Sequence, residues 1–227
     1  MLGAWVNFVA VILGALFGAL LKKGMPERIS NAMTTAVSMV VVYIGIDGMR
    51  SGTNTMVLVF AVIIGGLIGT LLDLDGKIHT LGNKVEEKFA SGGSGKVSEG
   101  FVSATLLFCV GAMAIVGPLQ SGLSGNHEMQ FTKSVLDFIS AIVFASALGG
   151  LGVGLSAFSV LVLQGGITLL AQLVSPYLTD YVIGEMTCAG SVLIFVLGLN
   201  LMGITKVKLM NYIPAILMPV VLCLFMK

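Results

Sequence analysis

Charged side chains are scarce in this sequence of 227 residues, since Lys, Arg, Asp and Glu together make up only 10% of it. A soluble domain carries about 25% charged residues, which its water-exposed surface needs. The sequence instead holds 56% hydrophobic residues and 30 glycines without a collagen-like period, a composition typical of helices that pack closely in lipid. The net charge of +1 gives no reason to expect nucleic acid as a partner. We therefore predict an all-α, polytopic transmembrane helical bundle that resides in the lipid bilayer.

Residues for covalent or metal chemistry are also few. The three cysteines, Cys109, Cys188 and Cys223, lie in apolar runs without a CxxC or Cys/His spacing, and His79 and His127 are the only histidines. The sequence contains no GxSxG, HExxH or phosphate-binding loop. We therefore expect no catalytic residues, no metal and no cofactor, and we expect that the protein is not an enzyme.

Apolar runs long enough to cross a bilayer, which takes roughly 20 residues, divide the chain into about eight spans. The predicted spans are Leu2–Leu21, Ala32–Met49, Thr55–Leu74, Val102–Leu119, Val135–Leu148, Gly154–Val174, Thr187–Ile204 and Met210–Met226. The first run lacks a cleavage pattern and is expected to remain as a helix. The fifth run is short, and a glycine-rich bend at residues 149–154 joins it to the sixth. It therefore stays open whether the fifth and sixth runs are two full spans or a re-entrant hairpin.

Lys and Arg residues gather on one face of this predicted topology. Nine fall on one side, namely Lys22, Lys23, Arg28, Lys77, Lys84, Lys88, Lys96, Lys206 and Lys208, and three on the other, namely Arg50, Lys133 and Lys227. Because basic loops stay in the cytoplasm, we predict a cytoplasmic loop at residues 75–100 and both termini outside. In this loop Ile78, Leu81, Val85 and Phe89 recur at helical spacing, which fits an interfacial helix or, more simply, a solvated connector.

The chain resembles itself at a distance of 153 residues. Residues 33–49 align without gaps on residues 186–202 with six of seventeen positions identical, and Asp47 aligns with Asn200. Because the second and seventh spans are expected to run in opposite directions, we predict an inverted repeat within one transmembrane domain, 1–227. Repeat 1 covers about 1–74 and repeat 2 about 154–227, with the loop 75–100 and the spans in 101–153 between them. Chance similarity between two apolar helices is the alternative.

Polar side chains inside the predicted spans require either a partner or a function, because burying them in lipid is costly. The pathway candidates for a solute or an ion are Asn7, Asp47, Asp137, Gln164 and Asn200. Simpler roles exist for two of them, since Asp47 could pair with Arg50, and Asp137, four residues after Lys133, could be a first-turn carboxylate. Small-residue pairs, Gly14/Gly18 and Gly65/Gly69, predict close helix packing, either within the fold or between copies of a homo-oligomer. Pro214 and Pro219 are expected to interrupt the last span.

The chain as a whole resembles the YqgA/YdfK-type family of bacterial multi-pass membrane proteins. The residues that carry this resemblance are Asn7, Gly14, Gly18, Pro26–Ile29, Phe108, Gly111, Lys133–Phe138, Phe144, Ala145, Leu148, Gly149, Gln164 and Asn211–Ala215. The resemblance implies a protein of the bacterial inner membrane, from a family of unknown function whose members are often labelled as transport proteins. It supplies no substrate.

Two functions therefore follow from the sequence. The first is a transporter or channel-like protein for a small solute or ion, which uses alternating access across the inverted repeat. The alternative is a non-transporting membrane scaffold or sensor that recruits a partner through the loop at residues 75–100.

Overall fold

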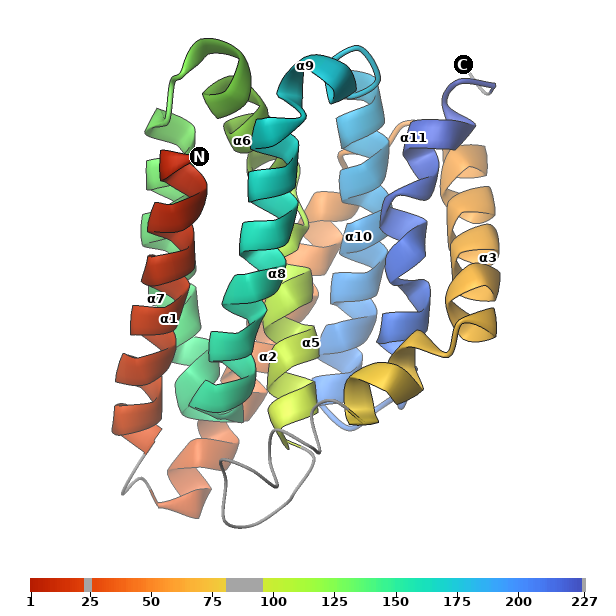
Figure 1. Cartoon of the computed structure of the whole chain (residues 1–227). Helices are drawn as coiled ribbons and strands as arrows, with labels where there is room; N and C mark the ends of the chain where they lie inside the picture. The colour runs from red at the N-terminus through yellow and green to blue at the C-terminus, as the bar shows by residue number, and fades with distance from the viewer. Residues whose placement is uncertain (23–25, 81–95, 226–227) are drawn as a thin grey trace. The chain divides into compact units, whose positions relative to one another are not determined.

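The computed structural model describes residues 1–22, 26–80 and 96–225, in which the regular elements are helices (Figure 1). In chain order they are α1 (Leu2–Lys22), α2 (Glu27–Met49), α3 (Thr55–Leu71), α5 (Lys96–Cys109), α6 (Ala112–Ser124), α7 (Glu128–Leu148), α8 (Gly150–Leu169), α9 (Ala171–Val174), α10 (Asp180–Leu201), the 3₁₀ helix η1 (Leu209–Ile216) and α11 (Met218–Leu222). The predicted all-α helical bundle is confirmed. Most of the predicted interfacial helix, with Leu81, Val85 and Phe89, lies outside the described residues.

Length and hydropathy identify five to seven spans in the described residues. Five helices are individually long and apolar enough to cross a membrane: α1, the segment Asn31–Met49 of α2, α7, α8 and α10. Two more spans result if each bent pair is one span, namely α3 with Leu74–Thr80, bent by 51°, and Val97–Cys109 with Met113–Ser124, bent by 58°. The segment predicted as the eighth span is a shorter apolar stretch, Leu209–Leu222, so these criteria do not support a count of eight.

Two predicted boundaries are wrong for the same reason. The fifth span was expected to begin at Val135 and the seventh at Thr187, but α7 begins at Glu128 and α10 at Asp180. The extra turns of these helices contain Lys133 and Glu185, respectively, which the structure buries inside the protein rather than leaving at the membrane edge. The helix of the fifth predicted span, α7, is therefore 21 residues long, and a single residue, Gly149 with φ of +111°, separates it from the 20-residue α8.

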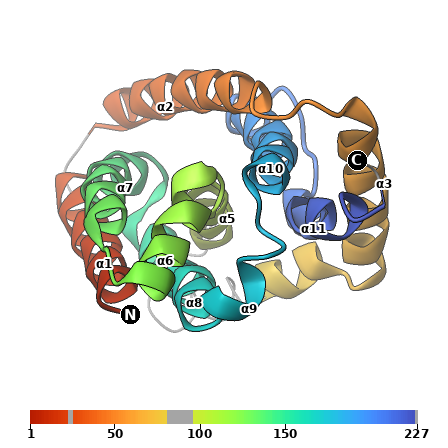
Figure 2. The same cartoon turned by 90° about the horizontal axis from the view of Figure 1, so that it is seen from above.

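The chain forms two compact units. The first comprises Met1–Val37, His79–Cys109 and Met113–Val174, and the second comprises Ser38–Ile78, Val110–Ala112 and Ser175–Lys227. In the first unit α1 packs along α7 and also contacts α8, which in turn packs on α5 (Figure 2). Glycines permit this close packing: a Cβ on Gly14 would lie 2.8 Å from the Cβ of Ala141, and one on Gly18 would lie 2.7 Å from that of Ala145.

Antiparallel helix pairs build the second unit. The C-terminal half of α2 packs against α10, where a Cβ on Gly45 would lie 2.5 Å from the backbone nitrogen of Phe195. The helix α3 packs against η1, and a Cβ on Gly65 would lie 2.7 Å from the Cβ of Ala215. As predicted, prolines interrupt the last segment, because Pro214 lies within the 3₁₀ helix η1 and a short α-helix follows it.

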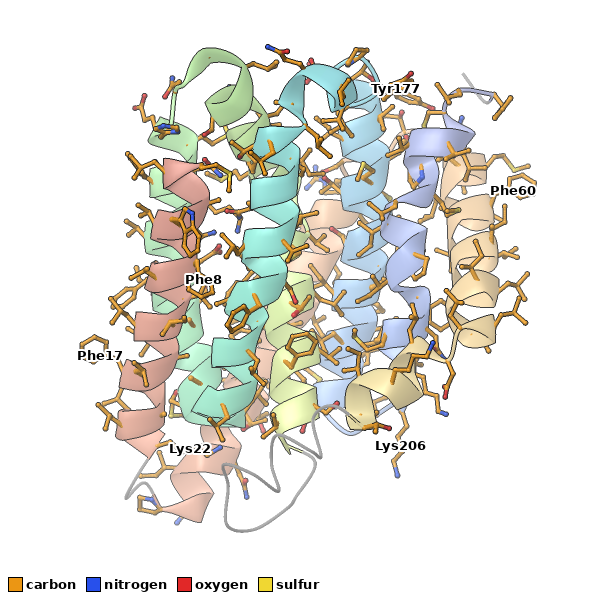
Figure 3. The ribbon with its side chains drawn as sticks, viewed as in Figure 1. Phe8, Phe17, Lys22, Phe60, Tyr177 and Lys206 are labelled. Atoms are coloured by element: carbon orange, nitrogen blue, oxygen red, sulfur yellow. The ribbon has the colours of Figure 1, made fainter. Side chains whose placement is uncertain are left out.

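Large apolar side chains cover the outside of these helices. On α1 the exposed positions include Leu13, Phe17 and Leu20, whereas its buried positions, except Val11, hold Gly, Ala or Asn. Figure 3 shows Phe17 pointing away from the helices of its unit, with Lys22 at the end of α1. A helix with bulky apolar residues outside and small residues inside is suited to a lipid environment rather than to water. The chain is therefore a membrane protein.

Candidate functional site

Polar side chains from three helices of the first unit meet in one hydrogen-bonded group, here called the polar cluster: Asn7 of α1, Lys133 and Asp137 of α7, and Gln164 of α8. The Nδ2 atom of Asn7 donates to Asp137 Oδ2 at 2.8 Å and to Gln164 Oε1 at 3.1 Å. The ammonium group of Lys133 lies 2.8 Å from both carboxylate oxygens of Asp137. The cluster therefore contains one ion pair with a formal net charge of zero.

Helix geometry places these groups. Lys133 and Asp137 are four residues apart on α7, so their side chains leave the same face of the helix. On α1, Asn7 lies on the same buried face as Gly3 and Gly14, which lets α1 approach α7 closely. The short distance between helices is what allows a side chain as short as that of Asn7 to reach Asp137.

The polar cluster is almost fully shielded. Asn7 is 0% exposed, Gln164 1%, Asp137 5% and Lys133 6%. Among the described residues, Asn7 Oδ1 and Gln164 Nε2 have no hydrogen-bond partner, and both amide atoms of Gln130 on the same helix as Lys133 are likewise unpaired and buried. Unpaired buried polar atoms cost free energy, so each requires an explanation, such as a ligand that completes the bonding. Chemically, the cluster offers hydrogen-bond donors and acceptors and one buried ion pair.

Three of the five predicted pathway residues, Asn7, Asp137 and Gln164, come together in this cluster. The other two belong to the second unit. Asp47 is exposed on α2. Asn200 holds the turn after α10, because its Nδ2 donates to Val207 O at 2.8 Å and its Oδ1 accepts from Thr205 Oγ1 at 2.6 Å.

Two members of the site were missed as site residues. Lys133 was expected on the outer face of the membrane, and only its spacing of four residues from Asp137 hinted at the pair. Gln130 gave no signal in the sequence, because it lies among polar residues that resemble a loop. Its burial follows from Gly3, which leaves room for the Gln130 side chain against α1.

Another buried carboxylate with several hydrogen bonds lies in the second unit. Glu185 of α10 is 2% exposed, and its Oε1 accepts hydrogen bonds from the backbone nitrogens of Thr53 at 2.7 Å and Asn54 at 2.9 Å and from Thr53 Oγ1 at 3.2 Å. Glu185 Oε2 has no hydrogen-bond partner in the part of the chain that the structure describes. The carboxylate thus satisfies the donors of the turn between α2 and α3, and Asn54 in turn caps α3 through its side chain.

The four glycines predicted for helix packing all make contacts inside the chain. Gly14 and Gly18 face α7, while Gly65 and Gly69 face η1. At these positions the small-residue faces are occupied by the protein's own helices, so they offer no support for the predicted homo-oligomer, which stays a prediction.

Two known proteins and one protein family match this chain over nearly its whole length. The chain is 31% identical over 223 residues to "Uncharacterized membrane protein YdfK" of Bacillus subtilis (strain 168), covering 96% of this chain and 94% of that protein. It is 30% identical over 221 residues to "Uncharacterized protein YqgA" of Escherichia coli (strain K12), with coverages of 96% and 94%. No solved structure is significantly similar. The family described as "Protein of unknown function (DUF554)" matches residues 2–224, so the resemblance is confirmed and the chain belongs to this family.

Proposed function

We propose that the protein is a membrane transporter for a small solute or ion, which works by alternating access across an inverted internal repeat. The observation that carries this proposal is the polar cluster, in which α1, α7 and α8 bury Asn7, Lys133, Asp137 and Gln164 together. Stability does not account for such a cluster, because a buried ion pair can often be replaced by apolar residues without loss. Ionisable groups inside membrane helices most often mark a path for substrates or ions.

The elements of the structure support the repeat. The shift of 153 residues that aligns Met33 with Met186 also places α1 on residues 155–175, α2 on 180–202 and α3 on 208–224. These ranges overlap α8, coincide almost residue for residue with α10, and cover η1 together with α11. A match that extends over three consecutive elements without a gap is unexpected for two apolar helices that are similar by chance.

The contacts between α2 and α10 are reciprocal under the same alignment. A Cβ on Gly45 would lie 2.5 Å from Phe195 N, and a Cβ on Gly198 would lie 2.9 Å from Val42 N. The alignment pairs Gly45 with Gly198 and Val42 with Phe195, so exchanging the two repeats exchanges the two contacts. A two-fold axis between antiparallel helices has this effect, and an axis of this kind in the membrane plane is the arrangement found in many transporters.

Flux through purified protein in liposomes tests the proposal. The wild-type protein should move at least one member of a panel of alkali cations, protons, inorganic anions, amino acids and sugars, and Asp137→Asn should abolish that flux. The matched control is Asp180→Asn, the same change at an exposed carboxylate in the first turn of α10, which should leave flux unchanged. Thermal unfolding of each variant separates lost transport from lost folding.

The proposal is wrong if the folded wild-type protein moves nothing in this panel and if Asp137→Asn has no phenotype in cells that depend on the wild-type gene. Flux that persists in folded Asp137→Asn would instead remove the polar cluster from the pathway.

A further inference from the structure

The polar cluster already contains one cationic group, the ammonium group of Lys133. The ammonium group of Lys133 lies 2.8 Å from each oxygen of the Asp137 carboxylate, where it occupies the position of a bound ion. Lys133 reaches this position from one turn away on the same helix, through a flexible stem of four carbons. The stem can withdraw the ammonium group without any movement of α7.

The amide groups of Asn7 and Gln164 bring two further oxygen atoms to the neighbourhood of the same carboxylate. Asn7 Nδ2 is 2.8 Å from Asp137 Oδ2, so the unpaired Oδ1 of the same amide group lies within a few ångströms of the carboxylate. Gln164 Oε1 lies 3.1 Å from that Nδ2 and brings a further carbonyl oxygen. Carboxylate and amide oxygens are the ligands that hard metal cations prefer.

The charge of the site selects the valence of the ion. Asp137 is its only carboxylate, and the described residues contain no group of three or more His, Cys, Asp or Glu side chains that could hold a metal ion. A single negative charge balances a monovalent cation, whereas a divalent cation usually needs several charged ligands.

We propose that Asp137 binds a monovalent metal cation in exchange for the Lys133 ammonium group, so that Lys133 is a tethered competitor of the transported or coupling ion. Binding of the cation does not depend on transport, but its use rests on the proposed function. In the structure described here the lysine occupies the site. When the ammonium group leaves, the metal cation takes its place on the carboxylate. The amide group of Asn7 then turns, so that its oxygen replaces its NH2 group beside the carboxylate and completes the coordination together with the oxygen of Gln164.

Removal of the lysine provides the test. In Lys133→Met the Asp137 carboxylate is buried without a cation, and small cations should rescue the variant. We expect sodium, lithium or potassium chloride to raise the melting temperature of the detergent-purified variant on the order of 5 °C above choline chloride at equal ionic strength. In the wild-type protein the shift should be smaller, because the lysine competes. The double variant Lys133→Met/Asp137→Asn is a neutral control and should show no cation-specific shift.

Each result of this experiment either supports or overturns the proposed cation exchange. Equal stabilisation of Lys133→Met by choline and by all three metal cations overturns the proposal, because it reflects ionic strength alone. If Lys133→Met does not fold, the wild-type protein and the double variant are titrated to high salt. A metal-specific shift in the wild-type protein alone supports the exchange, and identical curves overturn it. Cation rescue without flux in liposomes would leave this binding site in place and remove the proposed transport function.

Discussion

At the scale of single residues, the side chain of Asn7 connects three helices of the first unit. Both hydrogens of its amide group are used, one on Asp137 and one on Gln164, so one short side chain joins α1 to both α7 and α8. Asn7 is fully buried, so bulk water does not compete for these hydrogen bonds. A polar residue that connects three helices in this way fixes their rotation about their own axes as well as their distance.

In the second unit, Glu185 makes several hydrogen bonds to the turn between α2 and α3. Two substitutions of Glu185 should show whether these hydrogen bonds or the negative charge stabilise the protein. Glu185→Ala leaves the backbone donors of Thr53 and Asn54 without their acceptor, which should lower the free energy of unfolding by about 1–3 kcal/mol for each donor that stays buried. Glu185→Gln keeps a carbonyl acceptor and should cost clearly less. Unfolding of both variants in detergent micelles measures the difference, and equal losses would show that the hydrogen bonds to the turn are not what Glu185 contributes.

At the scale of helices, close approach decides where the site forms. The packing of α1 on α7 depends on glycine, because a Cβ on Gly14 would lie 2.5 Å from the carbonyl oxygen of Phe138. Gly14→Ala should therefore push the helices apart, lower the free energy of unfolding by about 1–3 kcal/mol and weaken the bond between Asn7 and Asp137. Gly166→Ala, in the interior of α8, is the matched control, because outside its own helix backbone its Cβ would meet no atom of the described residues within 4 Å.

The control should be neutral or stabilising by up to about 1 kcal/mol, since alanine favours a helix more than glycine does. Thermal unfolding of both variants, together with flux once a substrate is known, checks the pair. Equal behaviour of the two alanines would mean that the contact between α1 and α7 is not tight.

The helices themselves could largely be predicted from the sequence, and the errors have a common physical origin. Apolar runs place helices reliably in a protein of this composition, but charged residues were taken as the ends of spans. Lys133 and Glu185 break that rule, because partners within the fold offset the cost of burying them. The free-energy cost of placing polar groups in lipid also identified Asn7, Asp137 and Gln164 in the sequence as candidate site residues. Which polar residues share a site depends on helix rotation, which no local pattern in the sequence encodes.

At the scale of the whole molecule, an inverted repeat requires that equivalent positions lie on opposite sides of the membrane. The shift of 153 residues pairs Ser51, in the turn after α2, with Ile204, in the turn after α10. Within the second unit these turns lie near opposite ends of α10, because the backbone of Ser51 contacts Gly184 close to its start, whereas Ile204 follows its end. Ser51 and Lys206 are both exposed and suit labelling.

Single cysteines at Ser51 and Lys206, in a chain whose three native cysteines are replaced by alanine, test this requirement. In intact cells a membrane-impermeant maleimide should label Ser51→Cys, whereas Lys206→Cys should react only after permeabilisation, because the basic residues around it favour the cytoplasm. The opposite assignment would reverse the orientation but keep the inversion. Labelling of both cysteines from one side would mean that α10 does not cross the membrane. The reciprocal contacts of Gly45 and Gly198 would then be local packing, and alternating access across a repeat would lose its structural basis.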